Sequence, residues 1–156
     1  MSQLQSAGAS RAPSFISALN PLIRRLLGIG LPFGPNVLLT VRGRTSGVPR
    51  TFPVALIELG GRRYVQSPFG EVNWVHNLRA AGDAVVSRGG TQEPVVAIEI
   101  PPEAGGPILR DAVAPYLRSR LLAPVLRRFF RLRLDSTPEE LVEEARRHPM
   151  FELRPG

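Results

Sequence analysis

The chain has 156 residues, of which 43% are hydrophobic, enough for a single domain with a core of its own. Its formal net charge is +7 and every basic residue is arginine, so one arginine alone is weak evidence for an anion site. The absence of cysteine excludes disulfides, thiolate catalysis and cysteine zinc sites. His76 and His148 stand far apart and outside metal-ligand spacings, so no metal site built by the protein is expected.

The N-terminal part predicts a flexible segment followed by a helix. Residues 1–12 are small and polar and resemble neither a signal peptide nor a membrane span, so we expect a flexible N-terminus before one domain at 13–156. Apolar residues recur at helical spacing over 15–27, where Pro21 starts or kinks the helix. Glycine and proline then form a breaker-rich connection over 28–35.

The middle of the chain predicts antiparallel strands with one short helix between them. A Gly60-Gly61 pair is typical of a tight hairpin turn. The helix is expected over 72–81, where Trp74, Asn77 and Leu78 share one face and Gly82 follows the end. The predicted strands cover residues 37–41, 51–59, 63–67, 84–88 and 95–100.

The C-terminal third predicts helices and a last strand. An apolar stripe indicates a helix from residue 103, and over 117–134 apolar residues alternate with six arginines, with Pro124 splitting the region. Thr137 and Glu140 form a capping box for a helix that ends before His148, followed by a strand at 150–153. This order predicts an α+β fold with a mainly antiparallel sheet that closes partly into a small barrel.

A glycine-punctuated basic loop joins the first two strands. Residues 42–51 hold three arginines, three hydroxyl side chains and two glycines. Glycine lets the backbone approach a ligand, hydroxyl and amide groups donate hydrogen bonds, and guanidinium groups match phosphate. The loop is typical of an anion site, and equally typical of a solvated hairpin tip in an arginine-rich protein.

No residue pattern indicates that the protein supplies a nucleophile. The chain lacks a Gly-x-Ser-x-Gly elbow and a cysteine, and neither histidine has an obvious partner carboxylate in the sequence. If the protein is an enzyme, a bound cofactor therefore supplies the reactive atom. The acidic residues near the last helix fit its negatively charged first turns; they are Glu139, Glu140, Glu143 and Glu144.

Three single residues have ordinary structural interpretations. The lone Trp74 on a short helix is typical of core packing, although it could also contact a ligand. His76 lies off the face of Trp74 and fits a solvated or hydrogen-bonded position, and His148 before Pro149 fits a helix stop.

Three segments occur in the order found in one family. GRTSGVPRTFPV, SPFGEVNWVHNLRAAGDA and a closing HPMFEL resemble the deazaflavin-dependent nitroreductases and quinone reductases of actinobacteria, over residues 37–153. The resemblance implies a split β-barrel like that of flavin-binding pyridoxamine phosphate oxidases, with N-terminal, central and C-terminal helices packed around it. It also implies that reduced coenzyme F420, a deazaflavin, passes a hydride to a quinone, nitro compound or activated alkene.

The resemblance assigns binding roles to two segments. The basic loop would hold the phosphate and acidic tail of the coenzyme, while the residues around the short helix would line its ring and linker. No protein residue is implied as catalytic, and Tyr116 is a speculative hydrogen-bond donor. The implied coenzyme-binding residues are Arg44, Thr45, Ser46, Gly47, Arg50, Thr51, Gln66, Ser67, Pro68, Phe69, Gly70, Asn73, Trp74 and Asn77.

Two departures leave the identity of the coenzyme open at this point. Thr45 stands where many relatives carry lysine or arginine, and Glu71 stands where some place a basic residue. FMN, whose single phosphate the same loop could hold, is the second cofactor candidate, and a non-catalytic carrier of a flavin-like or lipid ligand is the alternative to an enzyme. A nucleic-acid module is disfavoured because few aromatic residues stand among the arginines of the loop.

The two basic amphipathic regions, 15–27 and 117–134, allow three interpretations: packed helices, contact with an anionic membrane, or an apolar mouth for the acceptor. Ordinary packing is favoured, and peripheral membrane contact is kept as a hypothesis. The expected partner is a small-molecule hydride acceptor, and the expected protein is a cytoplasmic monomer or homodimer.

Overall fold

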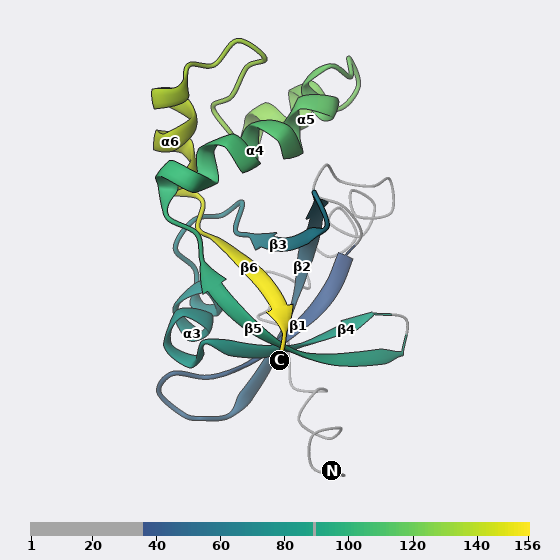
Figure 1. The fold of residues 1–156 in the computed structure, drawn as a ribbon, viewed down its shortest axis with the longest axis vertical. Helices are drawn as coiled ribbons and strands as arrows, with labels where there is room; N and C mark the ends of the chain where they lie inside the picture. Colours follow the sequence, from purple (N-terminus) through teal and green to yellow (C-terminus); the bar gives the residue numbers. More distant parts are fainter. Residues whose placement is uncertain (1–35, 89) are drawn as a thin grey trace.

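The computed structural model describes residues 36–88 and 90–156 (Figure 1). The expected flexible segment 1–12, the helix at 15–27 and the connection at 28–35 lie outside the described residues. Six antiparallel strands form a closed barrel in the order β1-β2-β3-β6-β5-β4. The strands are β1 (Asn36–Arg42), β2 (Pro49–Leu59), β3 (Arg62–Gln66), β4 (Asp83–Arg88), β5 (Thr91–Glu99) and β6 (Met150–Pro155). The barrel and the mainly antiparallel α+β class are therefore confirmed.

Helices cover the barrel at two places. The short helix α3 (Asn73–Ala81) lies along the barrel beside β1, β4 and β5 (Figure 1). The other three form a layer over one end of the barrel and are called here the helical layer: α4 (Pro102–Leu117), α5 (Ala123–Phe129) and α6 (Pro138–Arg147). Pro124 lies in the first turn of α5, so it separates α4 from α5 as the sequence indicates.

The alternation of side chains along the strands places one set inside the barrel. In β1, Val37, Leu39 and Val41 are buried, whereas Leu38 is 47% exposed. The β2–β3 hairpin turns at Gly60 and Gly61 with φ values of 57° and 76°, as expected for the predicted turn.

Two hydrophobic cores result. The first fills the barrel and includes Trp74, whose ring lies 6.3 Å from that of Phe151, which confirms the core-packing interpretation of the tryptophan. The second lies between the barrel and the helical layer, where Tyr64 and Met150 meet Leu109 and Leu126. This core therefore joins side chains from β3, α4, α5 and β6, which lie far apart in the sequence.

Three local predictions can be compared directly. The capping box is confirmed: Thr137 Oγ1 accepts from the Glu140 amide at 3.2 Å, and Glu140 Oε2 accepts from the Thr137 amide at 3.1 Å. Strand β5 begins at Thr91 rather than 95, because Pro94 is accommodated inside the strand opposite Val85. Glu144, expected among the acidic first turns of this helix, is buried and only 3% exposed.

Candidate functional site

The loop between β1 and β2 is folded back on itself. The Gly43 amide donates to the Val48 carbonyl at 2.9 Å, and the Gly47 amide donates to the Gly43 carbonyl at 2.9 Å. The Val48 amide donates to Ser46 Oγ at 3.2 Å. A Cβ atom at Gly43 would lie 2.7 Å from Ser46 Oγ, so the fold of the loop requires glycine at this position.

This loop carries positive charge that no described acidic side chain neutralises. Arg44 and Arg50 are exposed, and neither has an ion pair within residues 36–88 and 90–156. Arg50 Nε lies 3.9 Å from the position of a Cβ on Gly43, so this side chain lies close to the loop backbone. Thr45 is exposed, while the Thr51 hydroxyl is hydrogen-bonded to that of Thr40 at 2.8 Å. The loop is therefore a suitable place for an anionic group.

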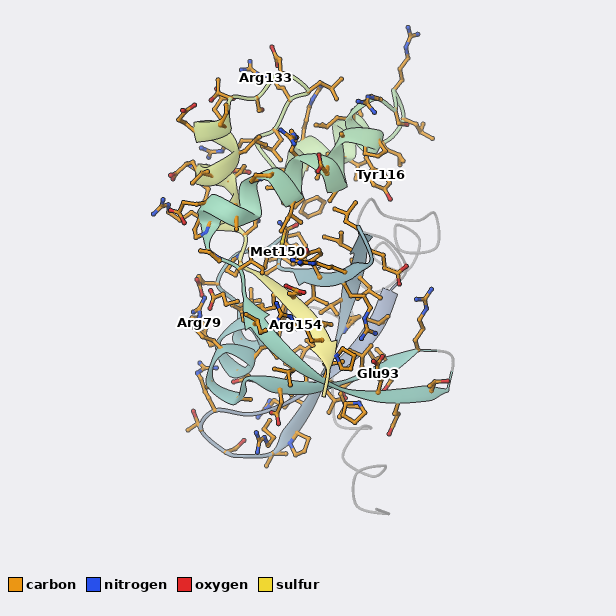
Figure 2. The ribbon with its side chains drawn as sticks, viewed as in Figure 1. Arg79, Glu93, Tyr116, Arg133, Met150 and Arg154 are labelled. Atoms are coloured by element: carbon orange, nitrogen blue, oxygen red, sulfur yellow. The ribbon has the colours of Figure 1, made fainter. Side chains whose placement is uncertain are left out.

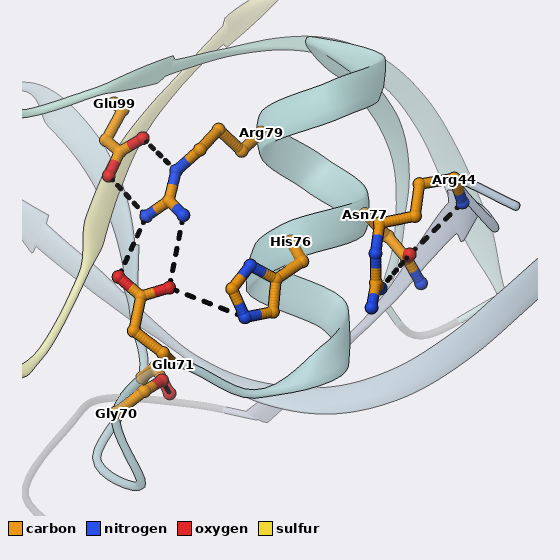
Figure 3. A network of polar contacts seen from close by, with 8 residues as sticks. Arg44, Gly70, Glu71, His76, Asn77, Arg79 and Glu99 are labelled. Carbon is orange, nitrogen blue, oxygen red and sulfur yellow. Dashed lines mark hydrogen bonds and ion pairs between the residues drawn. The ribbon is translucent and has the colours of Figure 1, made fainter.

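Asn77 joins this loop to α3. Its Oδ1 accepts from the Arg44 amide at 3.2 Å and from Arg44 Nη1 at 2.8 Å (Figure 3). Asn77 is buried, whereas Asn73 at the start of the helix is exposed. The two sequence motifs thus meet through this pair of side chains.

The segment before α3 forms a tight turn at residues 67–70. The Ser67 hydroxyl donates to the Gly70 carbonyl at 2.6 Å, and the Ser67 amide donates to the Pro149 carbonyl at 3.0 Å. Gly70 has a φ of 80°, and a Cβ there would lie 3.3 Å from the Arg147 carbonyl, so glycine is required on two grounds. The polar groups of Ser67 are used inside the protein, whereas the Phe69 side chain next to the half-buried Pro68 is 66% exposed.

Gln66 has a buried amide without a protein partner. It is 3% exposed, and neither its Oε1 nor its Nε2 has a hydrogen-bond partner among the described residues. Burying such a group without a partner costs about 1–3 kcal/mol.

On the other side of α3, Arg79 holds two carboxylates (Figure 3). Its guanidinium donates to Glu99 at 2.7 and 2.8 Å and to Glu71 at 3.1 Å. These hydrogen bonds lower the pKa of Glu71 and raise the pKa of Arg79. Because one guanidinium faces two carboxylates, the cluster keeps a net negative charge, and it lies on the side of α3 away from Arg44 (Figure 3). His76 Nε2 lies 3.7 Å from Glu71.

Two residues that were not predicted for the site contact the turn at 67–70: His148 and Phe129. His148 is buried, its Nδ1 lies 3.1 Å from the Ser67 carbonyl oxygen, and its Nε2 lies 3.4 Å from Glu144 Oε2. Phe129 meets Phe69 edge-on at 5.6 Å between ring centroids. The available signal was the spacing of Glu144 and His148, one helical turn apart at the end of α6.

Tyr116 lies apart from this cluster. It packs partly buried against the second core near the end of α4, on the other side of the molecule from Arg79 in Figure 2. In the part of the chain that the structure describes, no hydrogen bond joins Tyr116 to the residues implied in coenzyme binding. Its role as a donor stays a prediction.

An open groove between α6 and residues 127–133 offers a second concave surface. None of the residues implied in coenzyme binding lines it, and Glu139, Glu140 and Glu143 stand along one wall. Four arginines line the groove together with four glutamates, so its positive charge has acidic side chains beside it, unlike that of the β1–β2 loop.

The described residues contain no cluster of three or more potential metal ligands among histidine and acidic side chains. Within the same residues, no helix combines the length and hydrophobicity needed to cross a membrane. The candidate site comprises the loop at 43–50, the segment at 66–70 and α3, and the hydrogen bonds between Arg44 and Asn77 join the loop to the helix.

Comparison with known proteins identifies a family and a fold. Residues 22–116 match the model of a family described as F420H(2)-dependent quinone reductase. No curated protein matches the chain. A solved structure named as an F420-H2 dependent reductase is 19% identical over 77% of this chain and 94% of its own, with a TM-score of 0.49. A protein of unknown function from Agrobacterium tumefaciens is 15% identical over 94% of this chain and 57% of its own, with a TM-score of 0.52.

Proposed function

Because the chain belongs to the F420H(2)-dependent quinone reductase family and is an oxidoreductase that uses coenzyme F420, we propose that this coenzyme binds across the loop at 43–50 and the segment at 66–77. Its phosphate and acidic tail lie against Arg44 and Arg50. Its ring lies against Gln66 and the turn at 67–70. One observation carries this proposal. The loop at 43–50 holds glycines and exposed arginines without an ion pair among the described residues, and Asn77 binds this loop to α3 through two hydrogen bonds.

The residues present fit this coenzyme. A phosphate needs cationic donors, which the exposed arginines of the loop supply, together with the close backbone approach that Gly47 permits. A deazaflavin ring carries polar edge groups, and the buried Gln66 amide has both its donor and its acceptor unused. Thr45 contributes no charge, so the charge at this end of the site comes from its arginine neighbours.

The protein's own part in the reaction is to bind and position. When bound, the reduced coenzyme supplies the hydride. The arginines of the loop hold its anionic end, Gln66 orients its ring, and the exposed Phe69 supplies apolar surface beside it. Fixing the ring relative to the acceptor accelerates transfer by orientation, and no acid or base from the protein is required in this scheme.

The acceptor class is tested by turnover. The wild-type protein is mixed with reduced coenzyme F420 and menadione, and the return of oxidised coenzyme is followed by absorbance, with reduced FMN as the alternative donor. We expect quinone-dependent oxidation of the deazaflavin and no comparable use of FMN. Binding of the coenzyme without turnover on quinones, nitroaromatic compounds and enones would instead favour a carrier.

A second proposal concerns peripheral contact with an anionic membrane. It is supported by the turn between α4 and α5, where Leu121 is 83% exposed. No acidic residue occurs between Asp111 and Asp135. Four exposed arginines surround this turn without an ion pair among the described residues: Arg118, Arg120, Arg127 and Arg128. Each basic residue near an anionic lipid surface contributes about 1 kcal/mol, and an exposed leucine can enter the interface.

This membrane contact is tested by sedimentation with vesicles. We expect the protein to sediment with vesicles containing phosphatidylglycerol and to stay in solution with pure phosphatidylcholine. The double change Arg127→Gln and Arg128→Gln should weaken sedimentation, and so should Leu121→Ser. Equal behaviour of the variants and the wild type would exclude this turn as the contact.

A further inference from the structure

His148 connects the end of α6 to the turn at residues 67–70. It is the residue that follows the last turn of α6, and it is 8% exposed. Its Nδ1 lies 3.1 Å from the Ser67 carbonyl oxygen. Because a carbonyl oxygen only accepts, Nδ1 carries the hydrogen and donates. The ring is also packed on Phe130, with 4.5 Å between centroids.

The second ring nitrogen of this imidazole, Nε2, lies near a buried carboxylate. Glu144 is 3% exposed; its Oε2 lies 3.4 Å from His148 Nε2 and accepts from the Arg131 amide at 2.8 Å. Arg147 Nη1 lies 3.6 Å from the other carboxylate oxygen. A buried carboxylate is tolerated only with such partners, so the cluster holds the connection after α5, helix α6 and the turn in one arrangement.

The helical layer touches the same turn at two more points. Phe129 packs edge-on against Phe69, and the Arg147 carbonyl approaches the Gly70 backbone so closely that a Cβ would lie 3.3 Å away. Ser67, Phe69 and Gly70 are thus each fixed by the helical layer. The Ser67 backbone is held at both of its polar groups: its amide donates to the Pro149 carbonyl at 3.0 Å, and its carbonyl accepts from the His148 side chain.

We propose that His148 is a positioning residue for coenzyme binding: by donating to the Ser67 carbonyl it holds the turn at 67–70 in the conformation that lines the coenzyme. This inference rests on the proposed function, which places the coenzyme against that turn. A histidine that only anchors α6 would affect the stability of the fold and leave the intrinsic affinity for the coenzyme unchanged.

Two substitutions separate the two faces of the ring. An asparagine amide nitrogen reaches about the position of Nδ1, so His148→Asn keeps the donor to Ser67. A glutamine amide reaches about the position of Nε2, so His148→Gln keeps a polar group toward Glu144 and loses the donor to the turn. Thr137→Ala removes the hydroxyl of the capping box at the other end of α6 and serves as a control for general destabilisation.

The first readout needs no coenzyme. Amide hydrogen exchange of residues 67–72 in the free protein should accelerate in His148→Gln and stay near the wild-type rate in His148→Asn and Thr137→Ala. The second readout is the dissociation constant of oxidised coenzyme F420, measured well below the melting temperature. We expect a rise of about 10-fold for His148→Gln and less than about 3-fold for the other two, because one directed hydrogen bond is lost.

The outcomes are distinguishable. If His148→Gln changes exchange at 67–72 and coenzyme affinity no more than Thr137→Ala does, the histidine only anchors α6 and the inference is wrong. If the wild type does not bind the coenzyme, the proposed function itself fails.

A measurement on the wild type remains decisive if His148→Gln does not fold. Coenzyme binding should then slow amide exchange of Arg147 and His148 as well as of the residues at 67–72 that carry an amide hydrogen, because the His148 side chain and the Ser67–Pro149 backbone hydrogen bond join the two segments. Protection confined to 67–72 would contradict the coupling.

Discussion

Asn77 in the buried face of α3 accepts two hydrogen bonds from Arg44 in the β1–β2 loop, one from the amide at 3.2 Å and one from Nη1 at 2.8 Å (Figure 3). One side-chain oxygen therefore fixes both the backbone and the guanidinium of a loop residue. This contact explains physically why the glycine and arginine loop and the helix motif occur together in one chain.

Removal of this contact should loosen the loop. Asn77→Ala is expected to lower the free energy of unfolding by about 1 kcal/mol and to weaken coenzyme binding by about 3- to 10-fold. Without the contact the free loop is less ordered, so binding must also supply the entropy cost of ordering it. Urea unfolding and coenzyme fluorescence titration measure the two effects. Ala80→Gly, an exposed change on the same helix, should cost a similar stability without the loss of affinity. Equal affinities in both variants would rule out a role for the contact in binding.

Local patterns predicted most of the fold. The strand at 37–41, the Gly60-Gly61 turn and the capping box at Thr137 are each decided by residues close in sequence, and each was confirmed. Closure of the barrel depends on pairing of β3 and β5 with β6, between residues more than 50 positions apart; the order of elements indicated a partly closed barrel but not these strand pairs. The start of β5 was predicted at residue 95, whereas the strand begins at Thr91 and contains Pro94.

The candidate site was predicted in part. The two segments that carry it were visible in the sequence, but the contacts that order them were not. The burial of Glu144 was not predicted, because the sequence does not reveal that the Arg131 amide and His148 lie against it. The partnerless state of the Gln66 amide likewise depends on tertiary packing against the helical layer, which no local pattern encodes.

Gln66 should show opposite effects on stability and binding. Gln66→Met removes a buried donor and acceptor that lack protein partners, so the free protein is expected to gain up to about 1–3 kcal/mol of stability. The same change should weaken coenzyme binding, because the amide that orients the ring is lost. Thermal unfolding of the free protein and coenzyme titration test this pair of effects. A destabilised free protein would mean that the amide already has partners in solution.

Gly70 should be more sensitive than another glycine of similar backbone conformation. Gly70→Ala places a Cβ 3.3 Å from the Arg147 carbonyl at a φ of 80°, whereas Gly61→Ala meets no atom within 4 Å at a φ of 76°. The left-handed backbone destabilises both variants by about 1–2 kcal/mol, and the close contact with the Arg147 carbonyl destabilises Gly70→Ala further. Only Gly70→Ala is expected to weaken coenzyme binding. Chemical denaturation with titration compares them, and matching losses would contradict the close approach.

The ion pair between Glu71 and Arg79 makes stability depend on pH in the acid range. Its hydrogen bonds lower the pKa of Glu71 below the ordinary value of 4.5. Stability from this lowered pKa is present above pH 4.5 and is lost as the pH falls through the pKa of the folded state. Both side chains are partly exposed, so Glu71→Gln should cost about 0.2–1 kcal/mol at pH 7 and progressively less below pH 4.5. Urea unfolding across this range checks the trend. A difference in free energy of unfolding between the wild type and Glu71→Gln that grows as the pH falls would refute it.

The dissociation constant of oxidised coenzyme F420, measured by fluorescence for Arg50→Ala and for Arg62→Ala, tests the central claim most directly. Both arginines are exposed and lack an ion pair among the described residues, but Arg62 lies at the start of β3. Loss of a charge-assisted contact to phosphate is worth about 1.5–3 kcal/mol, so Arg50→Ala should weaken binding by roughly 10- to 150-fold, with Arg62→Ala within about 2-fold of the wild type. Equal affinity for all three proteins would contradict coenzyme binding at the β1–β2 loop.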